Sequence, residues 1–522
     1  MKPEPPPTAA PARFSQPRVL VCVLVAIAAL LRFTLAALGG QQAYPDEERF
    51  YRGVRLYLGI LHGETTGLRE IAAAPEHTLF SPVAAVAVAG QHLLAQATPF
   101  GDFRQPQNVE HTLWLGAAVL SLASALNIFW VHALARHAGA TTSEAGWAAV
   151  LMTAASSGLL HARHLLPYPT ALGFALAGLV VGLARPTLGR AAAAGFLAGI
   201  AYHIYNGYWF LVPTVWLAHT WWWQSAVQRH RLAGVAAAGA VFGVALPIAG
   251  GMAAGGSQYL AGLRAFSQTV TQGSFAEGWS LPWAYLWHAE GWLGAAVAAL
   301  IVAAIARAFH RRDALPRHVV LWLVTLATMY GLLVLFSTGL QRFVVYGRTV
   351  VPMTPLLCLL GGWAAAHALS TRGAATIVAA SAVLGLAALQ MRPLFSLVFP
   401  RDFEVAVLRH YGNPKRALTF SGCVYIPLAL PVTRPDLALV NAQSLYPLRA
   451  AVAPPRGATV LQLPHVLSHP VFQYEGHRPR ERALLREDGV WMSLIRLSDP
   501  AHTPDHPPPE LRFGPADRPS GR

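Results

Sequence analysis

Long apolar runs constrain the fold of this chain more than any other feature. The first extends from about Val19 to Ala37, long enough for a helix to cross a hydrocarbon core of roughly 30 Å. Similar runs recur over most of the first three quarters of the 522 residues, of which 54% are hydrophobic and only 12% charged. A soluble domain carries about twice that share of charge. The sequence therefore predicts a polytopic membrane protein with an all-α membrane domain.

Basic residues flank these runs and indicate their orientation. Lys2, Arg13 and Arg18 precede the first run, so the positive-inside rule places the N-terminus in the cytoplasm. Length and flanking charge predict about eleven spans, with every strongly basic turn on the inner side. The spans are expected near residues 19–37, 112–134, 144–160, 170–184, 191–223 (a hairpin of two), 232–254, 281–307, 319–337, 349–369 and 374–391. We interpret most of the net charge of +15 as topology and lipid contact, not nucleic-acid binding.

Composition divides the chain into four parts. These are a disordered cytoplasmic N-terminus (1–16), a transmembrane domain (17–391) with a first outer loop (40–111), a small outer α/β domain (392–500) and a disordered Pro-rich tail (501–522). In the outer loop, the apolar stretch 80–97 contains Gln91, His92 and Gln96, which favours an interfacial helix over a further span. In the outer domain, a helix is expected at 404–411 and strands at 416–420, 437–440, 459–463 and 491–495.

Cysteine and histidine spacing indicates neither a disulfide framework nor a metal site. The 3 cysteines are scattered, at Cys22, Cys358 and Cys423. The 21 histidines include no HExxH motif and no tight His/Cys pair with partners. We therefore expect no cofactor and no metal site, and a divalent metal requirement remains open.

An acidic cluster follows the first run on its outer side. Its strongest members are Asp46 and Glu47, within Tyr44-Pro45-Asp46-Glu47-Glu48-Arg49. A carboxylate there can act as a general base on a substrate that approaches from outside. Capping of the following amphipathic helix is the structural alternative, and the two roles are compatible. Arg49 has the chemistry to bind a phosphate or a lipid headgroup.

Other polar groups cluster in the outer turns. His161, Arg163 and His164 lie beside a Pro-Tyr-Pro turn, where they can cradle an anion or anchor the interface, and His77 has the same two interpretations. At the apex of the 191–223 hairpin, His203, Tyr205 and Asn206 suit hydrogen bonding to a sugar or between helices. Arg348, and more weakly Arg342, suit phosphate binding because the guanidinium can donate two hydrogen bonds; snorkelling is the alternative.

Together these features resemble the GT-C glycosyltransferases, particularly glycosyltransferase family 39 and the related bacterial aminoarabinose and mannosyl transferases. The resemblance covers residues 17–391 and rests on Pro45-Asp46-Glu47 after the first span, the interfacial helix, and Arg348-x3-Pro352-x2-Pro355. It implies inverting transfer of a sugar from a polyprenyl-phosphate carrier to an acceptor on the outer face.

The resemblance also implies roles for individual residues. Asp46 would take the acceptor proton and Glu47 would assist it or position the acceptor, while Arg348 would neutralise the leaving carrier phosphate and Arg49 would contact phosphate. The pattern departs from its relatives at two places. A second acid is common where this chain has His161, Arg163 and His164, and lipid A transferases have Lys at the position of His77. A lipid A acceptor is therefore not supported, and the sugar and acceptor stay open.

Two other classes of function remain open from the sequence. One is a transporter or flippase of a lipid-linked or anionic solute, which predicts ionisable residues buried mid-span and broken helices. The other is a non-catalytic subunit of envelope assembly. High Ala, Arg and Pro content suggests a bacterial source, so the expected location is the inner membrane, with the C-terminal domain in the periplasm. The expected partners are the lipid-linked sugar donor, an unidentified acceptor and membrane lipids.

Overall fold

The computed structural model describes most of the membrane domain and part of the tail. It covers residues 16–39, 41, 47, 49–64, 71–104, 108–109, 112–222, 226–270, 278–369 and 374–395, and strands within 440–496. Asp46, the predicted helix at 404–411 and the predicted strand at 416–420 lie outside the described residues.

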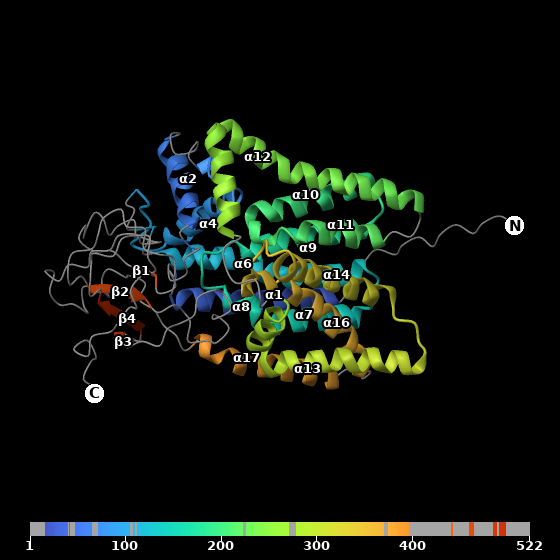
Figure 1. Cartoon of the computed structure of the whole chain (residues 1–522). Coiled ribbons are helices and arrows are strands. Elements are labelled where there is room, and N and C mark those ends of the chain that lie inside the picture. Colours follow the sequence, from blue (N-terminus) through green and yellow to red (C-terminus); the bar gives the residue numbers. More distant parts are fainter. Residues whose placement is uncertain are drawn as a thin grey trace.

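A bundle of roughly parallel helices forms the body of the protein (Figure 1). They are α1 (Gln16–Ala37), α6 (Leu113–His137), α7 (Thr142–Ala154), α9 (Tyr168–Ala184), α10 (Leu188–Ile204), α11 (Leu211–Trp222), α12 (Ala226–Val270), α13 (Leu281–Arg311), α14 (Arg317–Val334), α16 (Met353–Ala368) and α17 (Ala374–Phe395). Among the described residues, 6 helices are long and apolar enough to cross a membrane. The chain is thus a multi-pass membrane protein. The prediction of about eleven spans remains a prediction, because α7 and α11 have only 13 and 12 residues.

Two amphipathic or apolar helices, α2 (Phe50–His62) and α4 (Phe80–Ala95), lie across the ends of the long helices where α1 finishes (Figure 1). They pack closely through Gly53, where a Cβ atom would collide with the Cβ of Ala84 and lie 2.7 Å from the nitrogen of Ala85. The predicted helix at 80–97 is confirmed as a helix, with its bounds at α4. Short elements occupy the turns: α8 (Ser157–Leu160), η2 (Asn206–Tyr208), the π-helical turn η3 (Leu335–Gly339) and α15 (Gly347–Val350).

Small residues bring α10 and α12 into backbone contact. A Cβ at Gly195 on α10 would collide with the carbonyl oxygen of Ala236, and one at Gly239 on α12 with that of Ala192. Such small-residue interfaces let helices in a membrane approach closely.

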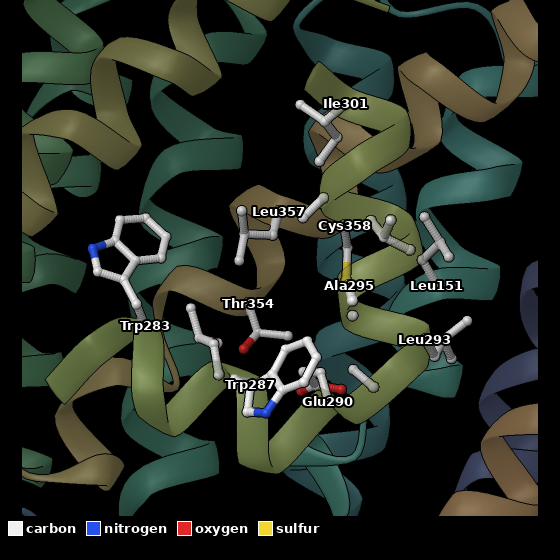
Figure 2. A pocket seen from close by; sticks show the side chains of 15 residues that line it. Leu151, Trp283, Trp287, Glu290, Leu293, Ala295, Ile301, Thr354, Leu357 and Cys358 are labelled. Carbon is white, nitrogen blue, oxygen red and sulfur yellow. The ribbon is translucent and has the colours of Figure 1, made fainter. Parts of the chain in front are cut away.

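Two long helices are broken by glycines in the left-handed region, Gly256 in α12 (φ 55°) and Gly291 in α13 (φ 52°). From Gly291 to Arg311 the helix is about 30 Å long at 1.5 Å per residue, which matches the hydrocarbon thickness. The break in α13 therefore lies about one hydrocarbon thickness from the end of the helix at Arg311. Beside it, α7, α13 and α16 enclose a cavity of about 210 Å³, lined by apolar side chains together with Glu290 and Thr354 (Figure 2).

The described part of the tail is a four-stranded sheet. Its strands are β1 (Val440–Asn441), β2 (Thr459–Leu463), β3 (Leu484–Glu487) and β4 (Val490–Arg496), in the order β1-β2-β4-β3. β1 and β2 are parallel, and β4 runs antiparallel to both of its neighbours. The strands predicted at 459–463 and 491–495 are present; the one at 437–440 overlaps β1 only at Val440, and β3 was not predicted. The α/β assignment of residues 392–500 stays a prediction.

Candidate functional site

The carboxylate of Glu47 joins the start of α2 to the turn that precedes α9. Glu47 is fully buried, and its Oε1 accepts a hydrogen bond from the backbone nitrogen of Leu165 at 2.7 Å. The same oxygen lies 3.2 Å from Nδ1 of His164. Residues 118 positions apart in the sequence are thereby held together.

His164 is buried, and desolvation lowers its pKa below the ordinary value of 6.5, although Glu47 opposes that shift. The imidazole is therefore neutral at pH 7, with the Nδ1 proton donated to the carboxylate of Glu47. This pair holds the turn before α9 against the residue that precedes α2.

Arg163 and His161 are buried in the same turn, not open to outer water. Arg163 is 1% exposed; its Nη2 donates to the carbonyl oxygen of Leu394 at 3.3 Å, and its own carbonyl accepts from Nε2 of Gln41 at 2.9 Å. Burial lowers the pKa of Arg163 to about 10, so it stays charged at neutral pH. The His161 ring meets Tyr168 edge-on, with centroids 5.1 Å apart. The expected anion cradle is therefore a packed cluster in this structure.

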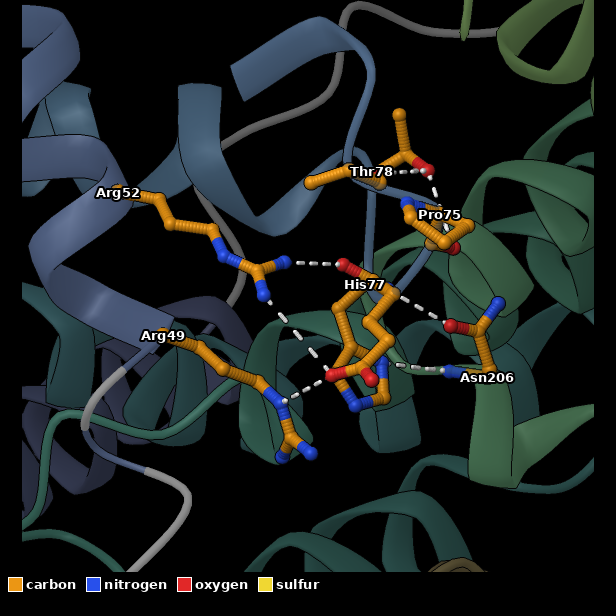
Figure 3. A network of polar contacts seen from close by, with 8 residues as sticks. Arg49, Arg52, Pro75, His77, Thr78 and Asn206 are labelled. Atoms are coloured by element: carbon orange, nitrogen blue, oxygen red, sulfur yellow. Dashed lines mark hydrogen bonds and ion pairs between the residues drawn. The ribbon is translucent and has the colours of Figure 1, made fainter. Parts of the chain in front are cut away.

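His77 and Asn206 hold each other through reciprocal hydrogen bonds (Figure 3). The backbone nitrogen of His77 donates to Oδ1 of Asn206 at 2.7 Å, and the backbone nitrogen of Asn206 donates to Nδ1 of His77 at 3.0 Å. His77 has a φ of 49°, a left-handed conformation that costs a non-glycine residue free energy. The two hydrogen bonds offset that cost and join the first outer loop to the apex of the α10–α11 hairpin.

A half-exposed cationic edge lies beside this pair (Figure 3). Nε of Arg49 is 3.7 Å from the Glu76 carboxylate, and Nη2 of Arg52 is 3.9 Å from the same oxygen. Nη1 of Arg52 also donates to the backbone carbonyl of Glu76 at 3.0 Å. Two guanidiniums around one carboxylate leave a net positive edge, suited to an anion.

Aromatic rings connect the hairpin apex to Arg348. Tyr205 stacks on His77 with centroids 5.0 Å apart and meets Tyr168 at 4.6 Å. The guanidinium of Arg348 lies 5.9 Å from the Tyr168 ring and 4.6 Å from that of Tyr346. The hydroxyl of Tyr208 donates to the carbonyl of Arg348 at 3.0 Å. The side chain of Arg348 is thus held by aromatic faces, a geometry that keeps a cation in place.

Two predicted residues point elsewhere. Nε2 of His203 lies 2.7 Å from the carbonyl of Val244 on α12, which matches the helix-to-helix alternative for this residue. Arg342 is exposed in the turn after η3, and the contact that the structure gives it is a backbone hydrogen bond to Phe336.

Sequence reasoning missed Glu76, Tyr168 and Glu290. Glu76 is the acid that lies between Arg49 and Arg52. Its position next to His77 in the sequence could have indicated that it belongs to the site. Tyr168 was visible only as part of the Pro-Tyr-Pro turn. Glu290 is a lone acid in an apolar run, which is itself a sign of function or of a specific partner.

No protein-family model matches the chain, and no curated protein sequence matches it. Among solved structures, the archaeal oligosaccharyltransferase AglB from Archaeoglobus fulgidus, in complex with an inhibitory peptide and a dolichol-phosphate, aligns at 12% identity with a TM-score of 0.39. The alignment covers 72% of this chain and 55% of AglB, so the chain spans about half of that protein.

The second neighbour is ArnT from Cupriavidus metallidurans. Bound to undecaprenyl phosphate, it aligns at 13% identity and a TM-score of 0.43, over 91% of this chain and 97% of its own. In the apo state the values are 14% and 0.40, over 92% and 98%. TM-scores below 0.5 mark a distant likeness, so any function must follow from this chain's own residues.

Proposed function

We propose that this chain is a membrane glycosyltransferase that moves a sugar from a polyprenyl-phosphate carrier to an acceptor on the outer face of the membrane. The observation that carries the proposal is the convergence of Glu47, His77, His164 and Arg348, which lie far apart in the sequence, at one end of a helical membrane bundle. Acid, imidazole and guanidinium groups side by side at a membrane edge suit transfer from an anionic lipid to a polar acceptor.

The proposed reaction is a single displacement. The acceptor oxygen attacks the anomeric carbon while Asp46 takes its proton; the bond from that carbon to the phosphate oxygen breaks, and the carrier leaves as polyprenyl phosphate. One displacement inverts the anomeric configuration. Negative charge grows on the leaving phosphate, so a fixed cation lowers the barrier, and Arg348 and Arg49 are the proposed contacts.

Glu47 has a different proposed role from Asp46. Its Oε1 is already shared between Leu165 and His164 and is closed from solvent. A carboxylate in that state positions the turn instead of taking a proton from an acceptor. We therefore propose that Glu47 holds the turn in place, whereas the resemblance implied that it assists the base or positions the acceptor.

A transporter is the second candidate, because α12 and α13 are broken helices and because Arg32 and Glu290 are charged residues within apolar helices. Transporters place such features near the bilayer midplane. Here the break at Gly291 lies about one hydrocarbon thickness from Arg311, at the outer edge. That position favours a site that opens to the outer face over alternating access.

The test is sugar transfer by the purified protein from a panel of polyprenyl-phosphate sugars, with an envelope extract as the acceptor source. We expect release of polyprenyl phosphate by the wild type and loss of at least about 100-fold for Asp46→Asn, the scale of general-base catalysis. Asp102→Asn, a change of an exposed acid in the same outer loop, is the matched control and should retain activity. Equal release of polyprenyl phosphate by Asp46→Asn and wild type would show that Asp46 is not the general base. Absence of release from every donor would contradict the proposed glycosyl transfer.

A further inference from the structure

The helical backbone is interrupted between α7 and α8, and the side-chain carboxyl group of Glu290 on α13 binds the backbone at this interruption. α7 ends at Ala154, Ala155 is extended (ψ 117°), and α8 begins at Ser157. Backbone N–H groups at such a break have no partner within their own helix. Oε2 of Glu290 accepts from the nitrogen of Ser156 at 2.8 Å, and Oε1 accepts from the nitrogen of Ser157 at 3.0 Å. Both oxygens of one carboxylate thus hold two successive amides.

A guanidinium binds the opposite side of the same peptide segment. Nη2 of Arg32, on α1, donates to the carbonyl oxygen of Gly158 at 3.2 Å. The hydroxyl of Ser124, on α6, donates to the same oxygen at 2.7 Å and accepts from Nε of Arg32 at 3.0 Å. An accepting carboxyl group on the N–H side and a donating guanidinium on the carbonyl side match the hydrogen-bonding polarity of a peptide. We name this arrangement, in which Glu290 and Arg32 hold residues 156–158 from opposite sides, the clamp.

The clamp is built from groups that are expensive in this environment. Arg32 is fully buried inside the apolar helix α1, and Glu290 sits at the wall of the cavity between α7, α13 and α16 (Figure 2). Charged groups within a membrane domain are costly and are retained where they do something specific. Hydrogen bonds from Nε2 of Gln390, on α17, to Oγ of Ser156 and the carbonyl of Ala289 connect a further helix to it.

The clamp lies directly before the turn that carries the candidate site. Backbone hydrogen bonds lead from Ser156 to Leu159 and Leu160, from Leu159 to Ala162, and from His161 to His164, without a break longer than one turn. The far end of this segment is held by Glu47 at Leu165. This hydrogen-bonded segment connects Ser156 to His161, Arg163 and His164.

We infer that Glu290 and Arg32 are positioning residues for the candidate site, acting through the backbone of residues 156–158 and not by touching substrate. The effect of these two residues on catalysis rests on the proposed glycosyl transfer. The structural part does not, because the hydrogen bonds to Ser156, Ser157 and Gly158 can be measured without any turnover.

The first test is amide hydrogen exchange of residues 155–165 in the full-length protein in detergent micelles. Glu290→Gln leaves one acceptor oxygen where two amides were held, so exchange of Ser156 or Ser157 should rise by about tenfold or more. Glu144→Gln is the matched control: it changes a buried carboxylate that caps the other end of α7 and binds the nitrogen of Thr141. It should leave residues 155–165 unchanged. Wild-type exchange in Glu290→Gln would overturn the clamp.

The carbonyl side has its own variant, because Arg32→Met can fail to fold. Ser124→Ala removes the hydroxyl that links Arg32 to Gly158 and should raise exchange over 158–162. If transfer is active, each variant should lower kcat per folded molecule by about tenfold or more and leave KM for the donor nearly unchanged, since neither group touches it. Raised exchange with unchanged kcat would overturn the positioning role. Raised amide exchange in the variants, together with no sugar transfer by the wild type, would support the clamp and contradict the proposed function.

Discussion

At the scale of single residues, the site depends on buried groups whose protonation is set by their neighbours. His164 is the clearest case. Desolvation lowers its pKa, and its Nδ1–H group donates a hydrogen bond to the carboxylate of Glu47. An unfolded chain binds a proton at this histidine below pH of about 6.5, whereas the folded chain does so only at lower pH. The unfolded state then holds more protons, so folding stability falls as the pH drops through that window.

We therefore expect the free energy of unfolding to decrease below pH 6.5, by up to about 1.4 kcal/mol per pH unit for this one group. Replacing His164 with Gln should flatten that slope, although stability at pH 7.5 falls as well. Equilibrium unfolding in mixed micelles between pH 5 and 7.5 measures it. His62→Gln, at the exposed end of α2, should keep the wild-type slope. An unchanged slope in His164→Gln would assign the dependence to other groups.

Glu76 makes a second residue-scale prediction, about the affinity for an anionic lipid. Its carboxylate lies within 4 Å of both Arg49 and Arg52 and competes with any phosphate there. Removing this charge in Glu76→Gln should tighten polyprenyl phosphate binding about three- to tenfold, the scale of one partly exposed charge pair. Titration of the purified protein with the lipid measures it, with Glu64→Gln at the exposed end of α2 as control. Weaker binding would mean that Glu76 orients the arginines instead of competing for them.

At the scale of elements, periodicity and length predicted where the helices lie in the sequence, but not which helices contact one another. The apolar runs predicted α1, α6 and α16 within a few residues, because burial in lipid leaves a simple signal. The break after Ala154 and its contact with Glu290 could not be predicted, since a hydropathy pattern does not specify which helices touch. His77 and Asn206 were both candidates from the sequence, yet their pairing appears only once α10 and the first outer loop are placed.

The contact between α2 and α4 gives an element-scale prediction. A methyl group at Gly53 has no room against Ala84 and the backbone of Ala85, so Gly53→Ala must displace one helix. We expect a loss of about 1–3 kcal/mol, the range for overpacking. Gly189→Ala in α10 is the matched control: nothing lies within 4 Å, and helix propensity predicts a small gain. Thermal unfolding in detergent compares the two, and equal melting temperatures would show that α2 and α4 can part without cost.

At the scale of the whole molecule, charge distribution predicts orientation. The turn between α13 and α14 starts at Arg312, directly after Arg311 at the end of α13, whereas the turn after η3 lies at the opposite end of α14. The positive-inside rule places the first turn in the cytoplasm and the second outside. Reporter fusions after Asp313 and after Leu340 should therefore show opposite locations. The same location for both would mean that α14 does not span the membrane.

The buried arginine of the first helix has a consequence for synthesis. Arg32 enters the membrane with α1, but Ser124 and Gly158 follow 92 and 126 residues later. At about 5–20 residues per second, the ribosome needs roughly 6–25 s to deliver Gly158. Until Ser124 arrives the guanidinium has neither partner, and until Gly158 arrives its set of partners is incomplete, so α1 must wait at the insertion machinery or snorkel toward the headgroups. Slow elongation before α8 should prolong this exposed state, and degradation of nascent chains would then depend on codon choice between α1 and α8.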